Sequence, residues 1–166
     1  MSEYRANFLA VSVELTGFDA IDLEATGLVD EYATLCLDIL RASDNADQYL
    51  QGLQRIVGAD DPATAIPVAL DDAFMGFLLR NIAALWYLGE WVKLPSSWYG
   101  AVGQPAIDTN TIPSLRAYEQ AFAWRVAGAH PPGTRPTGYG GWSLPPVDSA
   151  PLTGRAASRH DLEETR

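Results

Sequence analysis

The segment that most limits the folds open to this chain is the apolar stretch at residues 73–92, AFMGFLLRNIAALWYLGEWV. Its side chains are apolar on nearly every face of a helix, and Asp71 and Asp72 precede it at the helix's positive end. A transmembrane helix needs about 20 mostly apolar residues without a central charge. Because Arg80 and Glu90 leave no uncharged run longer than nine residues, we expect the buried central helix of a bundle and no transmembrane segment.

Apolar side chains at helical spacing predict three helices before this segment. Ser2 is the expected N-cap of the first helix. Its apolar face consists of Tyr4, Phe8, Val11 and Leu15. The second and third apolar stripes run over residues 28–40 and 46–57, with Ser43-Asp44-Asn45 as the cap of the third helix and Gly58 as its stop.

The last third of the chain combines turns, one more helix and a proline-rich end. Residues 94–112 are turn-rich, and a fifth helix is predicted over residues 113–128. Its expected inner face consists of Leu115, Tyr118, Phe122 and Val126. The predicted fold is therefore all-α: a single helical bundle of about five helices at 1–128, an extended Pro/Gly-rich C-terminal arm at 129–147, and a polar, disordered tail at 148–166.

The charge of the chain is strongly negative, and most of the excess lies near the N-terminus. The net charge is −10, and residues 1–61 alone hold 12 acidic against 3 basic side chains. An acidic body repels phosphate backbones and anionic lipid headgroups, so we expect neither a nucleic-acid partner nor a membrane-surface partner. The acidity itself is explained by solubility or, as the alternative, by a basic partner surface.

Few side chains with catalytic chemistry are present. Cys36 is the only cysteine, and its place in an apolar stripe predicts a core residue. His130 follows the fifth helix and is interpreted as its C-terminal cap, the alternative being a base that acts with Arg80 in a small helical enzyme. The acidic pairs at 60–61 and 71–72 are interpreted as helix caps, with metal binding as the alternative. No glycine-rich nucleotide-binding motif follows a strand, so no cofactor site is predicted.

Arg80 and a group of aromatic residues are the candidates for contact with another protein. A guanidinium within an apolar helix must pair with Glu90 or an acid of the first three helices, or else face a partner. Aromatic residues gather near the end of the same helix and just after it: Trp86, Tyr87, Trp91, Trp98 and Tyr99. The default interpretation of such a cluster is a core, and the alternative is a contact surface.

Two motifs resemble a known family. The first runs from Arg80 to Trp91, RNIAALWYLGEW, and the second joins GAHPPG at 128–133 to GYGGWS at 138–143. With the opening FLAVSVELTGFDAIDLEATGL, they resemble the family named for bacterial membrane-bound, FAD-containing D-sorbitol dehydrogenase, in particular the small subunit of sugar and sugar-alcohol dehydrogenase complexes. The resemblance covers roughly residues 4–146, and the second motif is the more specific.

This resemblance implies a non-catalytic helical subunit. A separate large subunit would hold FAD and oxidise the sugar alcohol, a cytochrome c subunit would pass the electrons on, and the small subunit would support stability, assembly and export of the large one. The implied location is the periplasmic side of the inner membrane. The N-terminus carries neither a secretion signal nor a twin-arginine pair, so the unprocessed chain is expected in the cytoplasm or exported on a partner.

The proline- and glycine-rich arm has two interpretations. A polyproline II segment extends about 3.1 Å per residue and loses little entropy on binding, so the arm can wrap a larger protein. The alternative is an arm folded over its own bundle. The residues of this region predicted to bind a partner are His130, Pro131, Pro132, Tyr139 and Trp142. A third functional alternative is a helical interaction module with no redox link.

Overall fold

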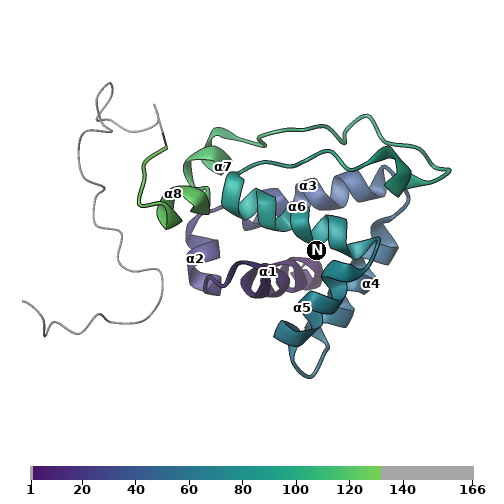
Figure 1. Cartoon of the computed structure of the whole chain (residues 1–166), viewed down its shortest axis with the longest axis horizontal. Coiled ribbons are helices and arrows are strands. Elements are labelled where there is room, and N and C mark those ends of the chain that lie inside the picture. The colour runs from purple at the N-terminus through teal and green to yellow at the C-terminus, as the bar shows by residue number, and fades with distance from the viewer. Residues whose placement is uncertain (1, 132–166) are drawn as a thin grey trace, which may run out of the picture.

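The computed structural model describes residues 2–131, and within them the fold is all-α (Figure 1). The described elements are α1 (Ser2–Thr16), α2 (Ala20–Ala25), α3 (Val29–Arg41), α4 (Ala46–Val57), α5 (Pro62–Asp71), α6 (Met75–Leu88), the 3₁₀ helix η1 (Ser96–Tyr99), α7 (Leu115–Glu119) and α8 (Phe122–Val126). Over this range no strand forms, and the single β-bridge joins Trp91 to Thr111. The predicted fold class is confirmed.

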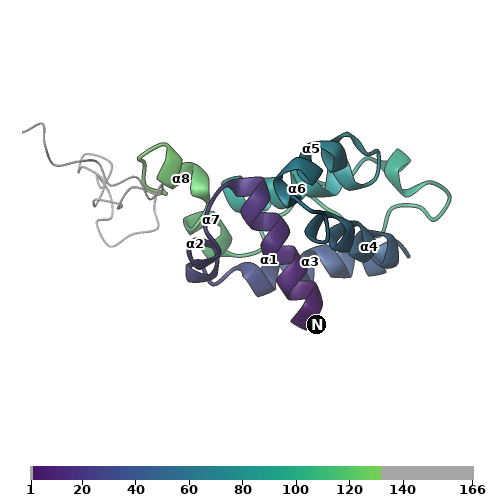
Figure 2. The same ribbon diagram turned by 90° about the horizontal axis from the view of Figure 1, so that it is seen from below.

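The helix α6 supplies much of the core on one side only, because Phe77 and Leu88 on its outer side are exposed, so the predicted burial on every face is wrong. It packs against α1, α5, α7 and α8, and α1 in turn contacts α2, α3, α4 and α5. Figure 2 shows α5 and α6 on one side of the molecule and α3 and α4 on the other. Trp86 of α6 is 1% exposed, with its ring edge-on to Tyr32 and stacked on Phe122. One continuous apolar core therefore joins the N-terminal helices to α8.

The central segment is shorter and more interrupted than the sequence predicts. The helix ends at Leu88 because Gly89 turns into the left-handed region at φ +70°, and the chain then runs extended. A Cβ on Gly89 would collide with the carbonyl oxygen of Ala117. At the other end, Asp72 accepts hydrogen bonds from the amides of Phe74 and Met75, which confirms its capping role and lowers the pKa of its carboxyl.

Two helices were missed and one predicted helix is divided. The short α2 lies between the first two predicted stripes, and α5 begins at Pro62, where Asp61 caps the amide of Ala63. The predicted fifth helix over 113–128 is wrong as a single element, because the chain breaks at Gln120–Ala121 between α7 and α8. Of its expected inner face, Leu115 and Val126 are exposed as a result.

Two predicted caps are also corrected. The helix α1 includes Ser2, which is therefore not an N-cap outside it. No side chain caps α4: Ser43 instead donates to the carbonyls of Ile39 and Leu40 at the end of α3, and Asn45 donates to Ser43. Gly58 does follow α4, as predicted.

No single helix within residues 2–131 is long and apolar enough to cross a membrane. Only α5 and α6 taken together have that length and composition, and a bend of 114° separates them.

Candidate functional site: an apolar face on α6

The outward side of α6 exposes Phe77 and Leu88, and the partly buried Ala84 lies between them. Phe77, Ala84 and Leu88 follow one another at spacings of seven and four residues, so they lie on one face. Phe77 is 41% and Leu88 55% exposed, although the opposite face of the same helix is fully buried. These side chains, which we call the stripe, lie on the outer side of α6, whose inner side packs in the core.

A second wall beside the stripe comes from the extended chain that follows Gly89. Val92 is 44% exposed and faces the gap between this segment and α6. The two walls enclose a cavity of about 290 Å³. Its lining consists of Phe77, Arg80, Asn81, Ala84, Val92, Lys93, Leu94 and Pro95. We call the stripe, Val92 and this cavity the α6 face.

Polar side chains hold the second wall in place. The Asn81 side-chain oxygen accepts a hydrogen bond from the Val92 amide at 2.8 Å, and the Asn110 oxygen accepts one from the Lys93 amide at 2.7 Å. Both bonds anchor the backbone of the extended segment, the first to α6 and the second to the returning chain. The orientation of Val92 toward the cavity is therefore fixed by the fold.

A buried carboxylate completes this support. Asp108 is 2% exposed. Its carboxylate accepts hydrogen bonds from the Trp91 indole N–H at 2.7 Å, the Leu94 backbone amide at 3.1 Å and the Gln104 side-chain amide at 2.7 Å. No cationic side chain among residues 2–131 pairs with it. Burial, reinforced by the nearby Asp108, raises the pKa of Tyr99. Three hydrogen bonds thus stabilise the Asp108 carboxylate, which links residues 91–94 to residues 104–108.

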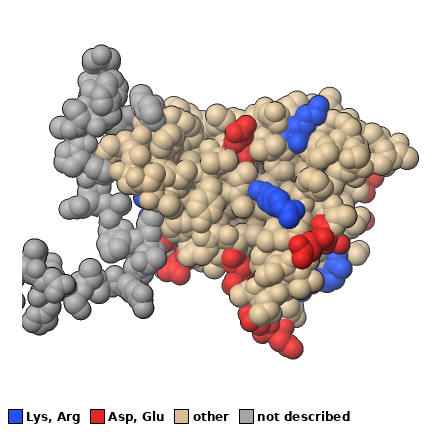
Figure 3. Space-filling view, in the orientation of Figure 1, with Lys and Arg blue, Asp and Glu red and all other residues tan. Residues whose placement is uncertain are grey.

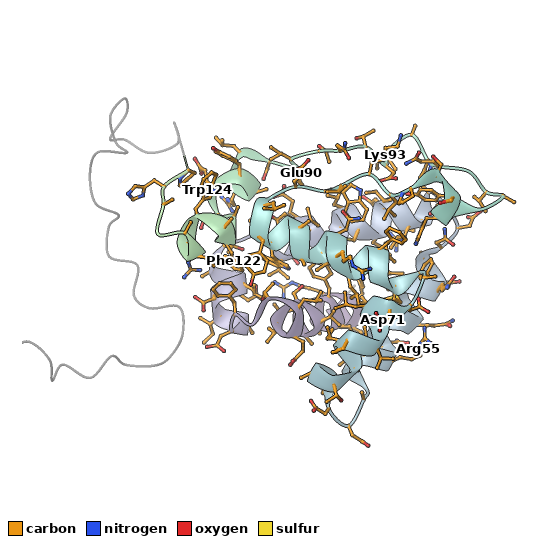
Figure 4. All side chains as sticks on the ribbon, in the orientation of Figure 1. Arg55, Asp71, Glu90, Lys93, Phe122 and Trp124 are labelled. Atoms are coloured by element: carbon orange, nitrogen blue, oxygen red, sulfur yellow. The ribbon has the colours of Figure 1, made fainter. Side chains whose placement is uncertain are left out.

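The charges around the α6 face differ from those of the chain as a whole. Figure 3 shows an uncharged surface over α6 that is interrupted by a basic side chain near its centre, with acidic side chains above and below it. Glu90 and Lys93 lie on the segment that passes above α6 (Figure 4). Neither Arg80 nor Lys93 has a carboxylate within 4 Å in the described part of the chain, whereas Arg5 pairs with Glu24.

Arg80 does not form the ion pair predicted for it. Its side chain is exposed, and one guanidinium nitrogen donates to the carbonyl of Leu70 at 3.0 Å, in the last turn of α5. A cation there stabilises the negative end of that helix. The prediction of an ion-pair partner at Glu90 or in the first three helices is therefore wrong for the described residues, and Arg80 also lines the cavity.

The aromatic residues predicted to bind a partner differ in burial: two are in the core and one is partly exposed. The predicted partner contact does not hold for Trp86 and Trp91, because both rings are buried, with 1% and 0% of their surface exposed. Tyr87 is half-buried, and its hydroxyl donates to the carbonyl of Thr16 at 2.8 Å, which joins α6 to the end of α1. The core interpretation is correct for the two tryptophans.

The candidates at the start of the arm lie beyond α8. The amides of Gly128 and Ala129 bond to the carbonyls of Arg125 and Trp124, so the backbone itself ends α8 in the pattern of a Schellman motif, with Gly128 at φ +61°. The predicted cap at His130 is therefore not needed. His130 is half-buried and does not line the cavity beside Arg80.

The remaining arm candidates are only partly described. Pro131 is buried against the body of the protein. Pro132, Tyr139 and Trp142 lie outside the described residues, as do nearly all of the predicted arm and the tail.

We find no second candidate site among the other reactive side chains of residues 2–131. Cys36 is buried in the core, where burial raises the pKa of its thiol to about 12. No cluster of three or more metal-ligating side chains occurs among residues 2–131. A further cavity of about 620 Å³ lies between α4 and α5, and Arg55 and Asp71 are on its rim (Figure 4).

Sequence reasoning missed the exposed stripe because α6 was expected to be buried on all sides. It also missed the support from Asn81, Gln104, Asp108 and Asn110, which lie up to 29 residues apart. The spacing of Phe77, Ala84 and Leu88 was the available signal for the stripe. No family model, curated protein or solved structure matches this chain.

Proposed function

We propose that this chain is the non-catalytic small subunit of an FAD-dependent sorbitol, polyol or sugar dehydrogenase complex, and that the α6 face binds the large flavin-containing subunit. The observation that carries the proposal is the exposure of Phe77, Leu88 and Val92 on neighbouring elements. Contiguous apolar surface of this kind marks protein–protein contact sites.

The composition of the α6 face fits an interface core with a polar rim. Phe77 and Leu88 supply apolar area, and Arg80 and Lys93 supply cations at the edge that have no carboxylate partner among residues 2–131. Aromatic and arginine side chains are the residue types that most often dominate binding energy. A partner surface with apolar side chains and nearby carboxylates would complement this arrangement.

The identity of the partner rests on the sequence resemblance. RNIAALWYLGEW supplies most of α6 and the residues just after it, and of the residues that carry the resemblance, Arg80 and Asn81 line the cavity of the α6 face. In such a complex, FAD belongs to the large subunit and a cytochrome c subunit receives the electrons. The role proposed for this chain is to stabilise and assemble that complex.

Co-expression with the large flavin subunit tests the proposal. We expect co-purification of the two chains, and at least a tenfold weaker complex for the double variant Phe77→Gln with Leu88→Gln, because each change replaces an apolar interface anchor by a polar amide. Ile21→Gln is the matched control, since Ile21 is 83% exposed on α2 and does not line the cavity of the α6 face. Equal binding by both variants would refute the role of the α6 face, and no co-purification would refute the proposed partner.

A helical interaction module with no redox link is the second candidate, because the same exposed stripe fits any protein partner. It predicts that the Phe77 and Leu88 variants lose a partner that contains no flavin. Absorbance of the captured complex at flavin wavelengths distinguishes the two candidates.

A further inference from the structure

We infer that residues 132–146 of this same chain, PGTRPTGYGGWSLPP, dock on the α6 face while the subunit is free. Binding of a larger partner to the same α6 face rests on the proposed function. The docking of the arm itself does not, because it concerns the isolated chain.

The first argument is the position at which the described chain ends. The helix α8 packs against the C-terminal half of α6, where Phe122 stacks on Trp86 with 5.8 Å between ring centroids. Pro131, only five residues after α8, is still buried. The arm therefore begins against the body of the protein, next to the end of α6 at which Leu88 is exposed.

The second argument is reach. The helix α6 has 14 residues and is about 21 Å long at 1.5 Å per residue. Fifteen residues in a polyproline II conformation span about 46 Å. The arm can therefore follow the stripe from Leu88 to Phe77 with length to spare, and its prolines reduce the entropy lost on docking.

Charge complementarity with the arm is limited to Glu90, because the arm brings no carboxylate to Arg80 or Lys93. The segment 132–146 has no acidic residue, and its one basic residue is Arg135. Glu90 lies at the end of the α6 face nearer to α7 and has no ion pair among the described residues (Figure 4). Arg135, four residues beyond Pro131, can reach that end of the face. The arm would thus shield an apolar surface until the large subunit takes its place.

A spin label on the arm of the full chain tests the docking. Ser143→Cys places a reactive thiol beside Trp142, and Cys36 does not compete for the label because its thiol is buried. We expect selective broadening of the amide signals of Phe77, Ala84, Leu88 and Val92, with the α2 signals around Ile21 unaffected. Adding Trp142→Gly should abolish the broadening.

Three results would overturn the inference: no broadening, uniform broadening over the whole bundle, or broadening that appears only between a spin-labelled chain and a separate isotope-labelled chain. The last would assign the face to a second copy. Because the measurement uses the chain alone, its failure leaves partner capture unaffected. Loss of partner capture with the broadening retained would instead refute only the proposed function.

Discussion

Removal of the buried carboxylate of Asp108 should destabilise the fold and loosen one wall of the α6 face. The carboxylate accepts three hydrogen bonds at 2.7 to 3.1 Å in a site that is 2% exposed. A hydrogen bond to a charged group contributes about 1.5–3 kcal/mol, and a buried donor left unpaired costs about 1–3 kcal/mol. Because these terms are not additive, we expect Asp108→Ala to cost about 3–5 kcal/mol.

A double-mutant cycle isolates one bond of this network. Trp91→Phe keeps an aromatic ring in the core but removes the indole N–H that donates to Asp108. Combined with Asp108→Ala, it should show a coupling of about 1.5–3 kcal/mol in the free energy of unfolding. Urea unfolding followed by far-UV circular dichroism measures this without relying on tryptophan fluorescence.

The neighbouring Thr109 provides the control for this cycle. Its side chain is exposed, so Thr109→Ala should change the unfolding free energy by no more than about 0.5 kcal/mol. Hydrogen exchange at Val92 and Leu94 should accelerate in Asp108→Ala, because the bond that fixes the Leu94 amide is lost. A coupling below about 0.5 kcal/mol, or unchanged exchange at both amides, would refute the reasoning.

Two further perturbations have expected outcomes. Gly89→Ala should lower the stability of the protein more than Gly17→Ala. Both glycines have positive φ, but only a Cβ at Gly89 would collide with the Ala117 carbonyl. Equal decreases in the melting temperature of the two variants would contradict this. Asp72→Ala should cost about 0.5–2 kcal/mol at neutral pH. Because backbone amides lower the pKa of Asp72, its contribution is present above the unfolded carboxyl pKa and is lost as the pH falls through the folded value. Unfolding curves across acidic pH should therefore converge for the wild type and Asp72→Ala, whereas Asp71→Ala, which caps no amide, should stay close to the wild type throughout.

The main helices were predictable from the sequence because their apolar residues follow a regular period. The stripes over 28–40 and 46–57 match α3 and α4 within two residues at each end. The breaks were less predictable. Pro67 lies inside α5 although proline favours helix starts, and the α7–α8 break interrupts a stripe that reads as continuous.

The α6 face depends on contacts that the sequence order does not reveal. Asn81 and Asn110 are separated by 29 residues, yet both hold residues 92–93. Whether a tryptophan is core or surface also depends on the path of the chain after Gly89, which turns Trp91 inward toward Asp108. Periodicity alone identifies the apolar residues of α6 but not the side that stays uncovered.

Hydrogen-exchange mapping of the full chain with and without the large flavin subunit tests the central claim most directly. The account predicts that protection on complex formation is concentrated in residues 77–95, which include the α6 stripe and the second wall of the cavity. Protection confined to α2 and α3, with residues 77–95 unchanged in a complex that does form, would contradict it.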